Sequence, residues 1–107
     1  MTTTSPPSPP SPQTLAELDT PAAVIETTRM VRNIERMQQK ADALGVRLRP
    51  HVKTTKCAEI FEAQRRAGAQ GITVSTLKEA DRFFAAGVTD ILYAVGMAAH
   101  RLDHALR

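Results

Sequence analysis

The sequence predicts an α/β fold in which parallel strands alternate with helices. Short apolar runs of strand length alternate with longer stretches whose apolar residues recur at helical spacing, and glycines close several of these stretches. The short connections favour parallel strands joined by right-handed helical crossovers. Periodicity alone leaves a doubly wound sheet and an eight-stranded barrel open. The sequence has no GxGxxG or GxxxxGK[ST] motif, so the usual nucleotide-binding versions of the doubly wound sheet lose support.

The chain begins with a tract made almost entirely of Ser, Thr and Pro. Residues 1–13 have no aliphatic side chain after Met1, so they are predicted to form a disordered tail. Residues 14–107 are predicted to form the folded part. This length suffices for a small α/β unit but is far below the roughly 250 residues of a complete (β/α)8 barrel.

The first predicted elements are a strand and the clearest helix in the sequence. Residues 22–26 form a short apolar run that fits a buried strand. From Thr27 to Leu44 apolar residues recur at helical spacing, and Gly45 follows as a suitable residue to end the helix. The polar residues of this helix are predicted to form a solvated face.

Residues 46–52 are predicted to form a second strand with two different faces. Side chains alternate across a strand, so the apolar face consists of Val46, Leu48, Pro50 and Val52. The other face consists of Arg47, Arg49, His51 and Lys53, the residue directly after the strand. One face is therefore suited to packing under helices, and the other is cationic and chemically reactive.

The remaining elements repeat the alternation. The sequence predicts, in order, a helix over 57–67, a strand over 71–74, a helix closed by Gly87, a strand over 91–95 and a helix over 100–107. Thr76 and Glu79 match a capping box at the start of the helix that Gly87 closes.

Composition excludes several classes of function. The net charge is only +3, the basic residues are scattered among acids and aromatic residues make up 4% of the chain, so nucleic-acid binding is not expected. No apolar run approaches the roughly 20 residues of a membrane span, and the N-terminus lacks the pattern of a signal peptide. We therefore expect a cytoplasmic protein. The single cysteine, Cys57, allows no internal disulfide and fits a reducing compartment.

Three stretches together carry a resemblance to a known family. They are LDTPAAVIE at 18–26, RNIER at 32–36 and RPHVKT at 49–54. From about Leu15 to its C-terminus, the chain resembles the N-terminal part of pyridoxal-phosphate (PLP) enzymes with the alanine-racemase-type barrel, also called fold type III. It is most similar to their D-threonine aldolase and D-serine dehydratase branch. The resemblance implies a partial (β/α)8 TIM-type barrel of about four β-α units, with the rest of the barrel and a β domain outside this sequence.

The resemblance also assigns candidate site residues. The family's lysine that matches Lys53 binds PLP covalently at the carboxyl end of a barrel strand, where barrel active sites gather. Arg49, His51 and Thr54 are the further candidates for cofactor binding. His51 has a second interpretation as a core histidine, and Thr54 has one as the cap of the following helix. Many members of this branch have histidine where Thr55 stands.

No metal site is predicted within this sequence. His100 and His104 lie four residues apart on a predicted helix, a spacing that can bind a metal, but no HExxH glutamate or third ligand accompanies them. The resemblance implies a divalent metal beside PLP whose ligands belong to the C-terminal β domain, outside this sequence.

The function implied by the resemblance is retro-aldol cleavage of D-3-hydroxyamino acids, such as D-threonine to glycine and an aldehyde. Dehydration of D-serine and amino-acid racemisation are the alternatives. The substrate would be a small amino acid, and the full-length parent would be a homo-oligomer. The isolated chain is expected to be inactive. A different class also remains open: a truncated, non-catalytic half-barrel that folds only with a partner.

Overall fold

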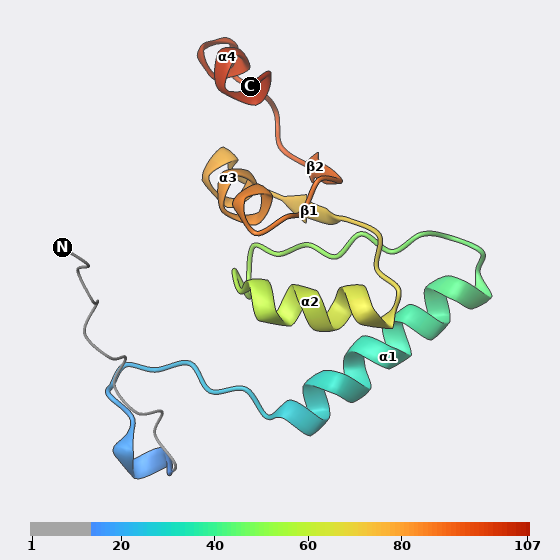
Figure 1. Ribbon diagram of the computed structural model, residues 1–107, viewed down its shortest axis with the longest axis vertical. Helices are drawn as coiled ribbons and strands as arrows, with labels where there is room; N and C mark the ends of the chain where they lie inside the picture. The colour runs from blue at the N-terminus through green and yellow to red at the C-terminus, as the bar shows by residue number, and fades with distance from the viewer. Residues whose placement is uncertain (1–13) are drawn as a thin grey trace, which may run out of the picture.

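The computed structural model describes residues 14–107 and shows helices arranged around a small parallel sheet (Figure 1). The predicted tail at residues 1–13 lies outside the described residues. The elements, in chain order, are η1 (Leu15–Glu17), α1 (Thr27–Ala43), α2 (Ala58–Ala67), β1 (Ile72–Val74), α3 (Leu77–Ala85), β2 (Ile91–Tyr93), η2 (Ala99–Arg101) and α4 (Leu102–Ala105). β1 and β2 pair in parallel, so the predicted α/β class is confirmed.

Helix α1 forms where the sequence predicts it. The carboxylate of Glu26 accepts hydrogen bonds from the backbone N–H groups of Thr28 and Arg29, at 3.1 and 2.6 Å. These bonds satisfy N–H groups that a helix start leaves without partners. At the other end, Gly45 has a φ of 68°, the left-handed conformation that closes a helix. The helix packs against α2, with Ala41 buried.

The starts and ends of α2 and α3 follow the same chemistry. Gly68 ends α2 and Gly87 follows α3, both with positive φ. The Thr76 hydroxyl accepts a hydrogen bond from Glu79 N–H at 3.0 Å, as the capping box predicts. The Glu79 carboxylate, however, accepts from Ser75 N–H at 2.9 Å, one residue earlier than a capping box requires. Because Glu79 reaches past the cap, it ties the helix to the end of β1.

The predicted strand over residues 46–52 is reduced to a single parallel bridge, between His51 and Thr73. Two bonds make this bridge: Val52 N–H donates to the Thr73 carbonyl at 3.0 Å, and Thr73 N–H donates to the Pro50 carbonyl at 2.7 Å. The next parallel rung would need Pro50 to donate a backbone hydrogen to Gly71, and proline has none. The ladder therefore stops after one bridge, although the segment still runs parallel to β1.

The prediction of a strand over residues 22–26 is wrong. These residues pair with no strand of the described structure, and Val24 and Ile25 are 62% and 51% exposed. A strand exists only where a neighbour accepts and donates its backbone hydrogen bonds, and among residues 14–107 the sheet begins after α1. The count of four β-α units is therefore also wrong. Three parallel segments form an open sheet, not a closed barrel.

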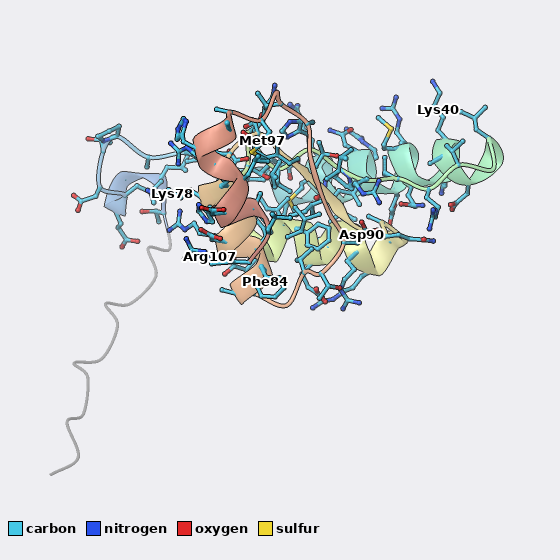
Figure 2. The ribbon with its side chains drawn as sticks, turned by 90° about the horizontal axis from the view of Figure 1, so that it is seen from above. Lys40, Lys78, Phe84, Asp90, Met97 and Arg107 are labelled. Atoms are coloured by element: carbon cyan, nitrogen blue, oxygen red, sulfur yellow. The ribbon has the colours of Figure 1, made fainter. Side chains whose placement is uncertain are left out.

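The core lies between this sheet and the helices on one of its faces. It consists of Val52, Phe61, Ile72, Val74 and Phe83. The rings of Phe61 on α2 and Phe83 on α3 meet edge to face, with centroids 6.2 Å apart and an interplanar angle of 84°. Phe84, the next residue of α3, is 66% exposed and points away from the sheet (Figure 2). Both helices thus bury one aromatic ring against the same sheet face.

The C-terminal helix is shorter than predicted. The sequence predicts a helix over 100–107, whereas the structure has η2 followed by the four residues of α4. No helix within residues 14–107 combines the length and the apolar character needed to cross a membrane.

Candidate functional site

The sheet register separates a buried face from an open face. Thr73 lies opposite both His51 and Leu92 in the parallel register. Residues level with one another in a sheet point to the same side, so these three side chains share one face. Val52, Val74 and Tyr93 occupy the next level and face the helices, because Val52 and Val74 are fully buried in the core. The alternation predicted for residues 46–53 is therefore confirmed next to the bridge, where Val52 is buried and His51 is exposed, and the cationic side is the open face. It is wrong at Val46, which is 55% exposed because no strand pairs with that end of the segment.

Lys53 lies where this first parallel segment ends. It follows the buried Val52 directly and is itself exposed. The chain then turns, and Lys56 N–H donates to the Val52 carbonyl at 2.9 Å to close the turn. Lys56 has a φ of 48°, a left-handed conformation that costs a non-glycine residue roughly 1–2 kcal/mol. The structure thus presents the Lys53 amine at the carboxyl end of the segment.

His51 is exposed and contacts the backbone of Lys53. Its Nδ1 accepts a hydrogen bond from Lys53 N–H at 3.3 Å. The exposure shows that His51 is not a core histidine. His51 therefore braces the backbone of Lys53, the first residue of the turn.

Arg49 is engaged at the opposite end of the segment. Its Nη2 lies 2.7 Å from Asp90 Oδ1, in an ion pair and hydrogen bond. Asp90 belongs to the loop that leads from α3 into β2 (Figure 2). Sequence reasoning missed this pair, because the two residues are 41 positions apart and only the register brings them together.

Thr54 and Cys57 lie between Lys53 and α2. Thr54 is exposed in the turn, and the residue that precedes α2 as its cap is Cys57, so Thr54 does not cap that helix. The Cys57 thiol donates to Glu59 Oε2 at 3.1 Å, and this bond lowers the pKa of the Glu59 carboxyl. The predicted cofactor contact of Thr54 remains a prediction.

Ser75 and Glu79 form a polar pair at the carboxyl end of β1. The Glu79 carboxylate is 7% exposed and accepts from the Ser75 N–H at 2.9 Å and from its hydroxyl at 3.3 Å. Extending the register by two residues from Thr73 places Ser75 on the open face, level with Lys53. Sequence reasoning identified Glu79 only as a capping residue. The available signal for the pair was the spacing: Glu79 follows Ser75 by four residues, across the end of a strand and the start of a helix.

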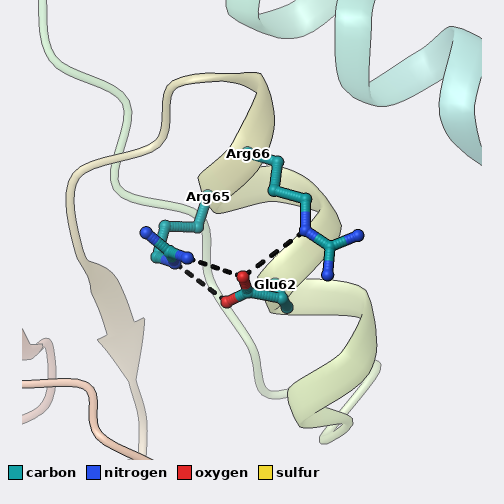
Figure 3. Close-up of polar contacts among 3 residues, drawn as sticks. All are labelled: Glu62, Arg65 and Arg66. Atoms are coloured by element: carbon teal, nitrogen blue, oxygen red, sulfur yellow. Dashed lines mark hydrogen bonds and ion pairs between the residues drawn. The ribbon is translucent and has the colours of Figure 1, made fainter.

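An ion-pair cluster lies in the C-terminal half of α2. Arg65 donates two hydrogen bonds to Glu62, at 2.8 and 2.6 Å, and Arg66 Nε lies 3.5 Å from the same carboxylate (Figure 3). The bonds from Arg65 lower the pKa of Glu62, and Glu62 in turn raises the pKa of Arg65. The cluster supports α2 and is not part of the site.

The two histidines of the predicted C-terminal helix are not arranged as a metal site. His104 Nε2 lies 2.8 Å from Asp81 Oδ2, which links α4 to α3. Among residues 14–107, no group of three or more His, Cys, Asp or Glu side chains could hold a metal ion.

Several known enzymes are similar to this chain. A D-threo-3-hydroxyaspartate dehydratase of Delftia sp. (strain HT23) is 71% identical over 94 residues, which cover 88% of this chain and 25% of that protein. The solved structure of the Delftia HT23 enzyme matches with a TM-score of 0.84 and 72% identity, covering 87% of this chain and 24% of that chain.

More distant relatives carry other activities. A D-threonine aldolase of Arthrobacter sp is 44% identical over 77 residues, covering 72% of this chain and 20% of that protein. A D-serine dehydratase of Dictyostelium discoideum is 38% identical over 93 residues, covering 82% of this chain and 23% of that protein. The chain therefore spans a fifth to a quarter of the length of these relatives.

The family itself follows from a match over most of the chain. The model of the alanine racemase N-terminal domain matches residues 25–107, a range that contains the parallel segments, Lys53 and all of the helices from α1 onward. The resemblance read from RPHVKT is thus confirmed, and the chain belongs to the alanine racemase N-terminal domain family.

Proposed function

We propose that this chain carries the lysine that binds PLP in a lyase acting on D-3-hydroxyamino acids, and that Lys53 is this residue. The observation that carries the proposal is the position of Lys53. It is an exposed amine at the carboxyl end of a parallel segment, on the open face of the sheet and within the family match. Active sites of parallel α/β barrels form at these strand ends.

The residues around Lys53 fit the aldehyde end of PLP. A lysine amine can attack an aldehyde and hold the cofactor covalently. Thr54 supplies an exposed hydroxyl next to the amine, and the brace from His51 fixes the backbone from which the Lys53 side chain leaves. When bound, PLP supplies an electron sink for charge that develops at the substrate Cα. The chain's own contribution is to hold the amine and the hydroxyls at one edge of the sheet.

The substrate proposal is a D-3-hydroxyamino acid, with dehydration preferred to retro-aldol cleavage. The preference comes from the 71% identity to a D-threo-3-hydroxyaspartate dehydratase, against 44% to a D-threonine aldolase. It reverses the order that the sequence alone favoured. Cleavage of D-threonine and dehydration of D-serine stay as alternatives, and the cytoplasmic location and homo-oligomeric parent remain predictions.

The attachment of PLP is tested by trapping it. Purified chain is incubated with PLP and reduced with borohydride, and the labelled peptide is identified by mass spectrometry. We expect the label on Lys53, no label there in Lys53→Ala, and unchanged labelling in the control Lys56→Ala. Labelling spread over surface lysines, or labelling of wild type no greater than that of Lys53→Ala, would sink the proposal.

The substrate class is tested on the PLP-loaded chain. D-threo-3-hydroxyaspartate, D-threonine and D-serine are added separately before borohydride reduction, and the label on Lys53 is followed by mass spectrometry. A substrate whose amine replaces Lys53 on PLP lowers the label on Lys53, because the reduced bond then lies on the substrate amine. We expect D-threo-3-hydroxyaspartate to act at the lowest concentration, whereas a stronger response to D-threonine would restore retro-aldol cleavage as the first choice.

A half-barrel that needs a partner is the second candidate. It is favoured by the open face of the sheet, where Leu92 is 49% exposed, and by the exposed apolar residues Val24, Ile25 and Met37. Sedimentation combined with urea unfolding tests this candidate. A monomer that unfolds in one cooperative transition would contradict it, and a poorly folded chain that becomes ordered on association would support it.

A further inference from the structure

Arg49, Gly71 and Asp90 meet at the amino end of the sheet, on its open face. The Arg49 guanidinium bonds to the Asp90 carboxylate at 2.7 Å across the strand that lies between them. A Cβ atom at Gly71 would lie 2.7 Å from both Asp90 Cγ and the Asp90 backbone oxygen. Only glycine therefore lets Asp90 approach β1 closely enough to reach Arg49.

This ion pair lies at the level where the backbone ladder is interrupted. Pro50 cannot donate the hydrogen bond to Gly71 that a regular parallel ladder would have there. Leu48, one level below, accepts from Gln70 N–H at 3.1 Å, and the Arg49 carbonyl accepts from the Thr73 hydroxyl at 3.2 Å. Side-chain bonds at Arg49 therefore hold the segment against β1 and β2 where one backbone bond is missing.

We propose that Arg49 and Asp90 form a clamp over Gly71 that fixes the level at which Lys53 leaves the sheet, so that Arg49 is a positioning residue and not a cofactor contact. Lys53 lies four positions after Arg49, which is roughly 13 Å along an extended segment. A guanidinium held at the amino end by Asp90 is therefore remote from a group bound at Lys53. The clamp acts on the register of the segment. Its consequence for PLP rests on the function proposed above.

The first test needs no cofactor. Amide hydrogen exchange of the full chain is followed at Val52 and Thr73, whose N–H groups make the single bridge. In Arg49→Met and in Asp90→Asn we expect exchange about two- to fivefold faster, the range that exposed ion pairs imply. The matched control is Arg47→Met, an exposed arginine on the same segment for which the described structure shows no ion pair. Unchanged exchange in both clamp variants overturns the clamp.

The second test separates positioning from contact. PLP affinity and the pH midpoint of the lysine-bound absorbance band are measured for Arg49→Met, Asp90→Asn and the double variant. A clamp predicts that each single change weakens affinity about two- to fivefold, that the midpoint stays fixed, and that the double variant is no weaker than either. A cofactor contact by Arg49 predicts instead that Asp90→Asn frees the guanidinium and leaves affinity unchanged or tighter, which overturns the proposal.

A charge swap distinguishes loss of the ion pair from general unfolding. The variant with Arg49→Asp and Asp90→Arg should recover wild-type exchange at Val52 and Thr73 if the ion pair is the active feature, and failure of this rescue in a folded chain counts against the clamp. If wild type is not labelled at Lys53 by PLP, the proposed function fails, while the exchange experiments still decide whether the clamp exists.

Discussion

The two faces of the sheet differ in what they contribute to the molecule. On the helix-covered face, Ile72 and Val74 are 0% exposed and pack against Phe61 and Phe83. On the open face, Leu92 is 49% exposed and lies level with Thr73, which in turn lies level with His51. The first face supplies the apolar burial that stabilises the fold. The second carries the reactive groups and buries little.

This division explains why the open face carries reactive groups but does not enclose them. Polar residues on an open face can be chosen for reactivity, because the helices on the other side supply the stability. The same openness leaves the Lys53 amine exposed to water. A site that holds a substrate would need further elements over this face. Substitutions on each face of the sheet test this difference.

The largest expected effect is on the buried face. Ile72→Ala should lower the free energy of unfolding by about 2–5 kcal/mol, because it removes a fully buried side chain and leaves a cavity. Leu92→Ala, the control on the open face, should cost about 1 kcal/mol or less. Urea unfolding followed by circular dichroism measures both. Equal losses would mean that the open face is buried in solution.

The next effect concerns the layer of helices behind the buried face. Gly68 has a φ of 129°, and a Cβ there would lie 3.0 Å from the side chain of the buried Gln38. Gly68→Ala should therefore destabilise the fold by about 1–3 kcal/mol, from backbone strain and overpacking between α1 and α2. Gly96→Ala, where the added atom meets nothing within 4 Å, should be neutral to about 0.5 kcal/mol. The urea midpoints of the two variants decide this.

A smaller effect of opposite sign is expected at the turn after Lys53. Lys56→Gly should stabilise the fold by about 0.5–1 kcal/mol, because glycine adopts the positive φ of Lys56 without strain and this gain exceeds its entropy cost. The same change in a helix, Lys78→Gly in α3, should destabilise by about 1 kcal/mol. A loss of stability in Lys56→Gly would show that the turn is not strained.

The smallest effect is a pH dependence on the surface of α2. Because hydrogen bonds from Arg65 lower the pKa of Glu62, the contribution of this pair is present above the ordinary glutamate value of about 4.3. It is lost as pH falls below that value, through the lowered pKa. Glu62→Gln should therefore slightly flatten the fall in stability at acid pH, which urea unfolding at a series of pH values measures; an unchanged pH dependence would contradict this.

The helices were predictable from the sequence because their signals are local. Gly45, Gly68 and Gly87 all adopt positive φ where the sequence suggested helix ends, and Thr76 caps α3 as predicted. The strands were less predictable because a strand depends on its neighbours. The apolar run at 22–26 has the composition of a strand but no partner in the described structure, and Pro50 shortens the pairing of the segment that leads to Lys53.

The site was predictable only where a motif or an alternation carried it. Alternation predicted that Arg49 and His51 share one face, and the register next to the bridge confirms it. Nothing in the sequence indicated the ion pair between Arg49 and Asp90, because the fold brings together two residues that are far apart in the chain. The left-handed conformation of Lys56 was equally hidden, because the surrounding structure imposes this strained backbone.

The half-buried Cys57 gives the chain a built-in place for a reporter. It is the only cysteine in the sequence, it directly precedes α2, and it lies four residues after Lys53 at the end of the same turn. A fluorophore or spin label attached to its thiol would need no background mutations. It would report whether this turn keeps one conformation when PLP is attached to Lys53, when the ion pair between Arg49 and Asp90 is removed, or when a partner covers the open face.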